Sequence, residues 1–350
     1  MTSHPQHLAR LLTGLILPGG WRVLSPVGLA PSAPGGISSQ AYLVESEAGV
    51  RAFLKALDYS AAFLQREPTR ALQAMMSAYL FERDLLAQCG ERRLSGVVTP
   101  LASGHVRFAD GPPPNVVEYL ILELADGDLA RMAELGERFD VAWALRALHH
   151  LARGLQQLHR LGIAHQDLKP ENVLLFGEIA KLGDLGRAAR RGTSGPFDHL
   201  EIAGDLAYAP PELLYGQLDP DWDHRRLGCD LYLLGSMAAF FFTGASMTAL
   251  WTAKLELRHR WQVWPSTFDE AMPYLRAAFD RAVSELAAQV PRELAAGLEA
   301  VVRQLCEPDP RRRGHPRDRT ALFGNPFNLE RYVAWFDRLA RRAEAGLRAK

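Results

Sequence analysis

The fold of this 350-residue chain is decided by one stretch of sequence, His165-Gln166-Asp167-Leu168-Lys169-Pro170-Glu171-Asn172, together with Asp184-Leu185-Gly186 shortly after it. Two carboxylates, Asp167 and Asp184, flank one amide, Asn172. Magnesium takes few protein oxygens and shares the phosphate oxygens of its ligand, so one amide and one carboxylate suffice to hold it. A carboxylate is also the kind of group that can accept a proton from a hydroxyl group. The pattern predicts a polar site that binds phosphate and a metal ion.

Hydrophobic patterning divides the chain into a strand-rich first part and a helical second part. Short runs of branched and aromatic residues predict strands, and longer runs with one apolar face predict helices. The predicted order is three strands, a helix, two strands and a long helix: Trp21–Val27, Gln40–Glu45, Arg51–Leu57, 69–88, Val97–Phe108, Val116–Glu123 and Val141–Leu161. Helical segments dominate thereafter. The change of character near residues 124–127 predicts a boundary between two lobes, where ligand sites are often built.

The composition excludes several classes of protein. Lysine plus arginine and aspartate plus glutamate each number 40, so no net charge marks a nucleic-acid or membrane binder. The three cysteines are widely spaced and form no zinc or disulfide pattern, which favours a reducing, cytoplasmic location. Nearly all basic residues are arginines, a bias typical of a GC-rich bacterial source.

Two apolar segments are not interpreted as membrane or targeting segments. Residues Leu231 to Trp251 carry no charge and are long enough to span a bilayer, but Gly235, Ser236 and other small or polar residues interrupt them. We expect a buried core helix there. The segment Leu11 to Leu17 is too short for a signal peptide and lacks a cleavage site.

The opening stretch resembles the catalytic loop H-R-D-L-x-x-x-N and the metal-binding turn D-F-G of the eukaryotic-like (bacterial) serine/threonine protein kinase superfamily. The resemblance covers about residues 21–315. It implies an α+β, two-lobed protein kinase fold with a small antiparallel-sheet N-lobe and a mainly helical C-lobe. It divides the chain into an N-terminal extension, an N-lobe, a C-lobe and a C-terminal basic helix, at 1–20, 21–125, 126–325 and 326–350.

The same resemblance implies ATP and Mg²⁺ as the nucleotide and the metal. Asp167 would accept the proton of the substrate hydroxyl, Lys169 would contact the γ-phosphate, and Asn172 and Asp184 would hold the metal. Lys169 is typical of serine/threonine rather than tyrosine kinases.

Further positions match the nucleotide site of the family. The strand Ala52-Phe53-Leu54-Lys55 resembles V-A-I-K, which places Lys55 at the α- and β-phosphates. Its partner would be Glu82, with Asp84 as the alternative. The resemblance assigns the remaining contacts to the phosphate loop, the adenine roof, the gatekeeper, two hinge backbones, the ribose and the pocket floor: Gly36, Phe53, Leu122, Glu123, Ala125, Asp128 and Leu174.

Three residues match structural positions that distinguish protein kinases from small-molecule kinases. Glu212, in Tyr208-Ala209-Pro210-Pro211-Glu212, is expected to pair in the interior with Arg313. A buried carboxylate without a partner would be very costly. Asp230 would begin the buried helix and anchor the catalytic loop. A protein substrate is therefore favoured over a small molecule.

Four positions depart from the family pattern, and three of them, the glycine-rich loop, Phe53 and Asp205, support an alternative, a pseudokinase that serves as a scaffold or nucleotide-binding module. The glycine-rich loop keeps only Gly36, and the large Phe53 stands where a small residue is usual, although Ala41 offers a smaller neighbour. Gln166 replaces the arginine that grips an activation-loop phosphate. Asp205 replaces a threonine, and it would either pair with Lys169 or repel phosphate.

The C-terminal residues 331–350 form an Arg-rich amphipathic pattern. We interpret them as a docked helix with a solvated face, and we hypothesise that this helix contacts a regulatory partner protein. The leading hypothesis is an ATP- and Mg²⁺-dependent protein kinase with nucleotide and protein substrates and no nucleic-acid or membrane partner.

Overall fold

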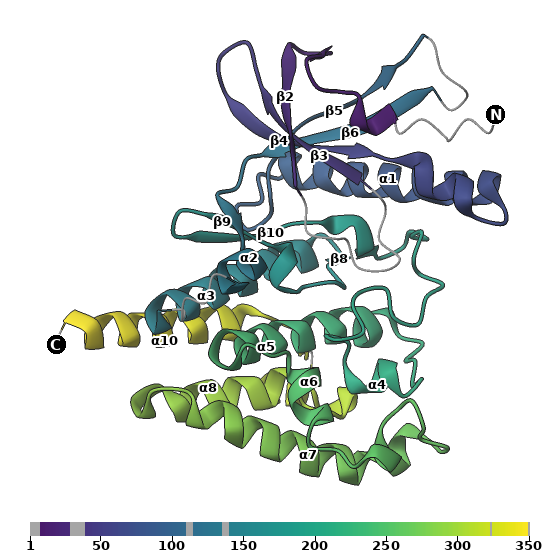
Figure 1. Ribbon diagram of the computed structural model, residues 1–350. Coiled ribbons are helices and arrows are strands. Elements are labelled where there is room, and N and C mark those ends of the chain that lie inside the picture. Colours follow the sequence, from purple (N-terminus) through teal and green to yellow (C-terminus); the bar gives the residue numbers. More distant parts are fainter. Residues whose placement is uncertain (1–7, 29–38, 110–114, 135–139, 323, 349–350) are drawn as a thin grey trace. The chain divides into compact units, whose positions relative to one another are not determined.

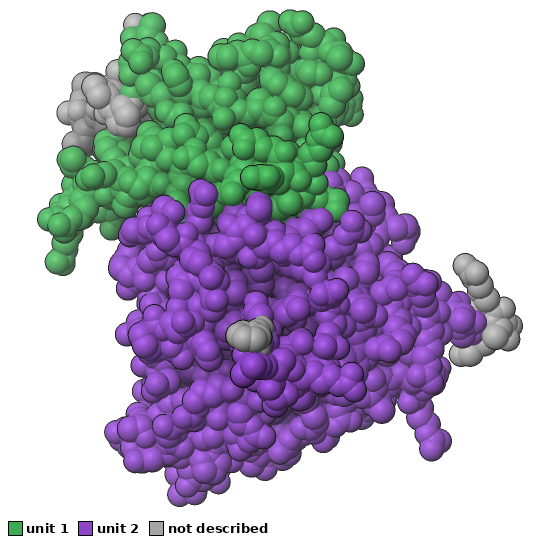
Figure 2. All heavy atoms as spheres, turned by 180° about the vertical axis from the view of Figure 1, so that it is seen from behind, with its two compact units in different colours: residues 1–125, 184–186 green, residues 126–183, 187–350 purple. Residues whose placement is uncertain are grey.

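The computed structural model describes residues 8–28, 39–109, 115–134, 140–322 and 324–348. The described chain forms two compact units, coloured in Figure 2. Unit 1 comprises residues 1–125 and 184–186, and unit 2 comprises residues 126–183 and 187–350.

Unit 1 is built on a six-stranded antiparallel sheet in the order β1-β2-β3-β4-β6-β5 (Figure 1). Its elements are η1 Leu8–Arg10, β1 Ile16–Leu17, β2 Trp21–Val27, β3 Ser39–Glu45, β4 Arg51–Leu57, η2 Tyr59–Leu64, α1 Pro68–Glu91, β5 Pro100–Arg107 and β6 Val116–Glu123. Strands β2, β4 and β6 have the predicted bounds, and the predicted helix 69–88 extends to Glu91.

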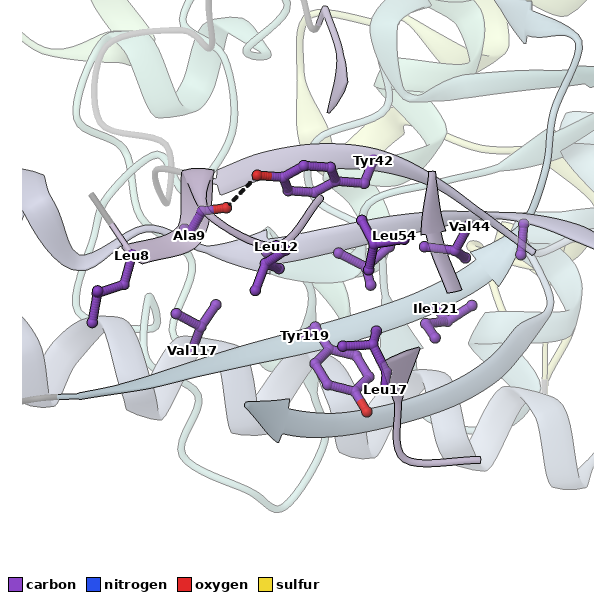
Figure 3. Close-up of a cluster of buried hydrophobic side chains, with 13 residues drawn as sticks. Leu8, Ala9, Leu12, Leu17, Tyr42, Val44, Leu54, Val117, Tyr119 and Ile121 are labelled. Carbon is purple, nitrogen blue, oxygen red and sulfur yellow. Dashed lines mark hydrogen bonds between the residues drawn. The ribbon is translucent and has the colours of Figure 1, made fainter. Parts of the chain in front are cut away.

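One face of this sheet is covered by the beginning of the chain (Figure 3). Alternate residues of β4, Ala52, Leu54 and Ala56, are fully buried in a cluster that includes Leu8 and Leu12. The hydroxyl of Tyr42 donates a hydrogen bond of 2.7 Å to the carbonyl of Ala9. Residues 1–20 were expected to be an extension that precedes the sheet. Instead, residues 8–17 supply a strand and part of the core. Side chains of β3, β4 and β6 point alternately to the two faces of the sheet, so the face opposite Lys55 is also apolar and needs a cover.

Unit 2 is mainly helical, with short strand pairs. Its elements are β7 Gly127–Asp128, α2 Leu129–Glu134, α3 Val141–Arg160, β8 Ile163–Ala164, η3 Pro170–Asn172, β9 Val173–Phe176, β10 Ile179–Leu182, β11 Ala189–Arg190, α4 Pro211–Leu214, η5 Asp223–Leu227, α5 Gly228–Thr243, α6 Met247–Thr252, η6 Leu257–His259, α7 Phe268–Ala288, α8 Arg292–Leu305, η7 Pro310–Arg312, α9 Pro316–Thr320 and α10 Glu330–Arg348. The short turn η4, Leu185–Arg187, belongs to both units.

The apolar segment Leu231–Trp251, expected as one buried helix, lies in the core of unit 2 but forms two helices, α5 and α6, separated by residues 244–246. In α5 every residue from Gly228 to Phe241 is buried, and the helix ends at Gly244, whose φ of 75° suits a glycine cap. None of the helices in the described part of the chain has the length and apolarity needed to span a membrane.

The C-terminal helix α10 packs along α3 (Figure 1). Its buried side chains include Tyr332 and Phe336, and Arg146 of α3 forms ion pairs of 2.6 Å with Asp337 and Glu344. The expected docked helix is present. The predicted fold class, a mixed fold with an antiparallel N-terminal sheet and a helical C-terminal part, is confirmed.

Candidate active site

In unit 1, Lys55 joins two carboxylates that lie far apart in the sequence. Its Nζ donates to both carboxylate oxygens of Glu82 at 3.0 Å and to Oδ1 of Asp184 at 3.1 Å. Glu82 is therefore the ion-pair partner, whereas the alternative, Asp84, is exposed and pairs with Arg83. The geometry places a single cation between two anions.

Local periodicity explains how this cluster is assembled. Along β4 the side chains alternate, so Lys55 lies on the face opposite Leu54 and the core cluster. On α1 the residues buried at spacings of three and four include Tyr79, Glu82 and Leu86. Glu82 thus lies within the apolar stripe of the helix, where the Lys55 ammonium compensates its charge.

The metal-binding turn adopts a strained conformation. Asp184 has φ of 49°, in the left-handed region that non-glycine residues rarely adopt. The backbone N–H of Gly186 donates to Oδ1 of Asp184 at 3.2 Å, and Leu185 between them is fully buried. A Cβ atom at position 186 would lie 3.0 Å from the same oxygen, so the glycine permits this close turn. Strain of this kind is concentrated at functional sites.

The three charges shift one another's protonation. Lys55, through its charge and hydrogen bond, holds the pKa of Asp184 well below its ordinary range. Burial opposes the charge of Lys55, but Asp184 and Glu82 raise its pKa above the ordinary value. Burial raises the pKa of Glu82 to about 7, with Lys55 acting in the opposite direction. Asp184 is therefore ionised at neutral pH, which is the state that its predicted role as a metal ligand requires.

Replacing Glu82 by glutamine is expected to flatten the pH dependence of stability. The pKa of Glu82 is about 7 in the folded protein and 4.5 ordinarily. Between pH 4.5 and pH 7 the folded protein therefore keeps a proton on Glu82 that the unfolded protein has lost. The wild type therefore loses stability relative to Glu82→Gln as the pH rises from 4.5 to 7. Urea midpoints across this range measure the effect, and Asp84→Asn, exposed on the same helix, should keep the wild-type slope. Equal slopes for Glu82→Gln and the wild type would contradict the shift.

In unit 2, the catalytic loop holds Asp167 between polar neighbours. Asp167 is 8% exposed. Its Oδ1 accepts a hydrogen bond of 2.9 Å from the N–H of Asp205, and its Oδ2 accepts one of 3.1 Å from Nδ2 of Asn172. The same nitrogen of Asn172 donates to the carbonyl of Asp167 at 2.7 Å. Both bonds use the amide nitrogen, so the amide oxygen of Asn172 is the atom that could serve the predicted metal contact.

Asp230 of α5 anchors the catalytic loop. Its carboxylate accepts bonds of 2.8 Å from the backbone N–H groups of His165 and Gln166, and it contacts Nε2 of His159 at 2.8 Å. Burial alone would raise the pKa of Asp230, but these hydrogen bonds, with His159 foremost, hold it below its ordinary value. The anchor expected from the sequence is present, and His159 is a partner that sequence reasoning missed, because its i−6 position before His165 follows no known motif.

Asp205 pairs with Lys169, which resolves one of the two alternatives left by the sequence. The Nζ of Lys169 lies 3.2 Å from Oδ2 of Asp205 and 3.6 Å from Oδ2 of Asp167. Burial opposes the charge of Lys169, but Asp167 and Asp205 raise its pKa. At Gly204 a Cβ would lie 2.3 Å from the carbonyl of Gln166. This glycine lets the segment approach the loop closely enough for both contacts.

If Lys169 acts on the γ-phosphate as the kinase resemblance implies, replacing Asp205 by asparagine should raise the rate of phosphoryl transfer about three- to tenfold, the equivalent of one hydrogen bond to Lys169. The variant keeps the backbone N–H that holds Asp167 and a side-chain oxygen for the N–H of Ala207, while Lys169 loses a competing anion. Steady-state rates at saturating ATP measure the effect, with exposed Glu178→Gln as the control for lost charge. A rate that falls severalfold would mean that the carboxylate of Asp205 supports transfer.

The residues predicted to contact the nucleotide are distributed over both units. In unit 1, half-buried Phe53 shares the face of Lys55 and is paired in register with Leu43 and Leu122. Leu122 is buried. Glu123 is the last residue of β6, and its side chain accepts a hydrogen bond of 2.7 Å from the N–H of Thr99. Ala125 is the last residue of the first segment of unit 1.

In unit 2, the carboxylate of Asp128 accepts a 2.8 Å bond from the N–H of Arg131, so it also caps α2. The sequence did not indicate this second role. Leu174 lies opposite Asp128 in the β7–β9 pair and packs over Gly183, where a Cβ would be 2.8 Å from the leucine methyl. Gly36 lies outside the described residues.

The predicted pair of Glu212 and Arg313 is present in the interior of unit 2. Arg313 is fully buried, and its guanidinium makes two parallel bonds to the Glu212 carboxylate, the longer of them 2.7 Å. Further donors reach the carbonyls of Glu307 and Gly228 at 3.0–3.1 Å. Glu212 ends the segment that follows the metal-binding turn, residues 187–212, which we call the activation segment. The pair connects this end to Arg313, which lies 101 positions away in the sequence.

A family model described as the protein kinase domain matches residues 106–319. The serine/threonine-protein kinase PknJ of Mycobacterium tuberculosis is 31% identical over 179 residues, 49% of this chain and 30% of the relative. An Aurora kinase of Debaryomyces hansenii is 33% identical over 128 residues, 36% of this chain and 30% of the relative. The chain thus spans about a third of the length of these relatives. Since the family model covers more than half of the chain, the chain belongs to the protein kinase domain family.

Proposed function

We propose that the chain transfers the γ-phosphoryl group of ATP to serine and threonine hydroxyl groups of protein substrates, with Mg²⁺ as the metal. The observation that carries the proposal is the position of Lys55, held by Glu82 and Asp184 at 3.0–3.1 Å. A fixed cation next to an ionised carboxylate suits a triphosphate and its metal ion. Phosphoryl transfer depends mainly on such positioning and charge neutralisation.

The donor set fits a magnesium ion. The carboxylate of Asp184 is ionised and its side chain is 47% exposed, while Asn172 presents an amide oxygen. Hard oxygen ligands, few in number, are what Mg²⁺ takes beside nucleotide phosphates. When bound, the ion would neutralise charge on the phosphates.

Asp167 and Lys169 would act on the acceptor. Asp167 orients the substrate hydroxyl and accepts its proton, and its carboxylate is held in place by Asp205 and Asn172. Lys169 neutralises charge on the transferred group, in competition with Asp205. The remaining nucleotide contacts are proposed for the residues that sequence analysis assigned to them.

The substrate class rests on two observations. The printed name of PknJ describes a serine/threonine-protein kinase, and Lys169 of this chain agrees with that class. The buried Glu212–Arg313 pair is the arrangement that favours a protein substrate. We further propose a cytoplasmic protein with no nucleic-acid or membrane partner, whose helix α10 contacts a regulatory protein.

A pseudokinase is the second candidate, and Phe53 is the observation that favours it. This half-buried side chain shares the face of β4 with Lys55, where the adenine roof is proposed. A large aromatic ring there would restrict nucleotide entry. Fully buried Ala41, paired with Lys55 in register, is the small neighbour that favours a repacked roof instead.

The experiment is transfer of labelled γ-phosphate from Mg·ATP to the protein itself and to a generic protein substrate, with Asp167→Asn in parallel. Label on serine or threonine with the wild type, and none with the variant, supports the proposal. Absence of label with the wild type would overturn it, and ATP binding measured by calorimetry would then separate a nucleotide-binding module from a scaffold.

A further inference from the structure

The residue after His165 in the catalytic loop is buried and tied to another element. Gln166 is 4% exposed and has φ of 68°. Its Nε2 donates to the carbonyl of Arg226 at 2.8 Å and to Oδ1 of Asp230 at 3.1 Å. Its Oε1 accepts a bond of 3.2 Å from Nη1 of Arg226. Gln166 therefore uses both ends of its amide to bind the segment before α5.

The guanidinium of Arg226 continues this connection to the activation segment. Arg226 is 4% exposed, and its second terminal nitrogen donates to Oδ1 of Asp198 at 3.2 Å and to the carbonyl of Asp198 at 3.3 Å. Because the guanidinium is planar and rigid, its two ends fix the distance between the partners. One buried arginine thus bridges the catalytic loop and the segment that follows the metal-binding turn.

Neighbouring residues of the same turn hold the segment at two more points. Arg225 donates to the carbonyl of Leu200 at 2.7 Å. Arg191 forms an ion pair with Asp223, and its guanidinium lies 5.0 Å from the ring centre of Trp222. Residues Asp223–Leu227 form a π-helical turn, a rare conformation that is frequent at functional sites.

We propose that Arg226 is a positioning residue that couples Gln166 to Asp198, so that the activation segment is held in place by an internal carboxylate without phosphorylation. The inference rests on the proposed function for its effect on transfer. Asp198 carries the negative charge that meets the buried arginine, and it is fixed in turn by the N–H of Gly195 at 2.6 Å. The exposed hydroxyls of Thr193 and Ser194 are then not required for order.

The test compares Asp198→Asn with Glu201→Gln in the full chain after phosphatase treatment. Both changes remove one negative charge from the same segment, but Glu201 is exposed and three residues from the bridge. Amide hydrogen exchange of residues 193–205, measured without nucleotide, should become about tenfold faster in Asp198→Asn, as expected for one lost charge-assisted hydrogen bond. Glu201→Gln should match the wild type, and Asp198→Glu should restore part of the protection.

Transfer assays provide the second measurement. Asp198→Asn should lower kcat severalfold with little change in KM for ATP, and phosphatase treatment should leave the wild-type rate unchanged. Unchanged exchange in Asp198→Asn overturns the inference, as does a wild-type rate that falls on phosphatase treatment. If the wild type transfers no phosphate, the proposed function fails, whereas the exchange comparison still decides whether Asp198 holds the segment.

Discussion

Replacing Asp167 by asparagine is expected to lower the rate of phosphoryl transfer by a factor of roughly 100 to 10,000, the range for a lost general base. The substitution keeps the shape of the side chain. An amide cannot accept the hydroxyl proton, and it must also place an NH₂ group against one of two donors, the N–H of Asp205 or Nδ2 of Asn172. Single-turnover transfer at saturating Mg·ATP measures the loss.

Two controls separate this loss from a general defect. The affinity for ATP should stay within about twofold of the wild type, because the role proposed for Asp167 concerns the acceptor hydroxyl rather than the nucleotide. The free energy of unfolding should fall by about 1–3 kcal/mol, for one donor left unsatisfied. Wild-type transfer by the variant would show that another group accepts the proton and would remove Asp167 from the proposed role.

Replacing Arg313 by methionine is expected to lower the free energy of unfolding by about 3–5 kcal/mol, the range for breaking a buried ion pair. The variant leaves the carboxylate of Glu212, which is 5% exposed, without its cation. It also leaves the carbonyls of Glu307 and Gly228 without their donors. Chemical denaturation followed by circular dichroism measures the change.

The neighbouring arginine provides the matched control. Arg312 is exposed, so Arg312→Met should change stability by less than about 0.5 kcal/mol. A double variant, Glu212→Leu with Arg313→Met, removes both charges and should recover part of the loss, since uncompensated burial is the main penalty. A loss below about 1 kcal/mol for Arg313→Met alone would contradict a buried, fully desolvated pair.

Residues in short ordered motifs were predictable because the chain positions them locally. Asp167 and Asn172 are five residues apart, and Asp184 and Gly186 are two residues apart. Over such short distances the order of the residues largely determines which side chains lie close together. Longer-range pairs were predicted where a motif existed on both sides, as with Lys55 and Glu82 or Glu212 and Arg313. The resemblance implied the fold class, and the predicted order of strands and helices agreed with it.

The bridge from Gln166 to Asp198 could not be predicted, because Gln166 and Asp198 lie 60 and 28 residues from Arg226, and neither Arg226 nor Asp198 belongs to a familiar pattern. The pairing of Lys169 with Asp205 was left open for a related reason. The negative charge of Asp205 could either attract Lys169 or repel a phosphate, and the sequence does not distinguish the two effects. The distance of 3.2 Å between Lys169 and Asp205 shows that the attraction is present. The sequence did not predict that residues 8–17 cover the sheet, because Leu8, Leu12 and Leu17 are not spaced with the period of a strand or a helix.

That covering has a consequence for how the protein is best handled in the laboratory. The family match begins at residue 106 and the first long strand at Trp21, so sequence comparison invites trimming of everything before them. A fragment cut at Trp21 would expose Leu54, Tyr119 and their neighbours to water. Exposed apolar surface of this kind promotes aggregation. Poor yield of such a fragment would reflect a missing part of its core rather than an inherently insoluble domain.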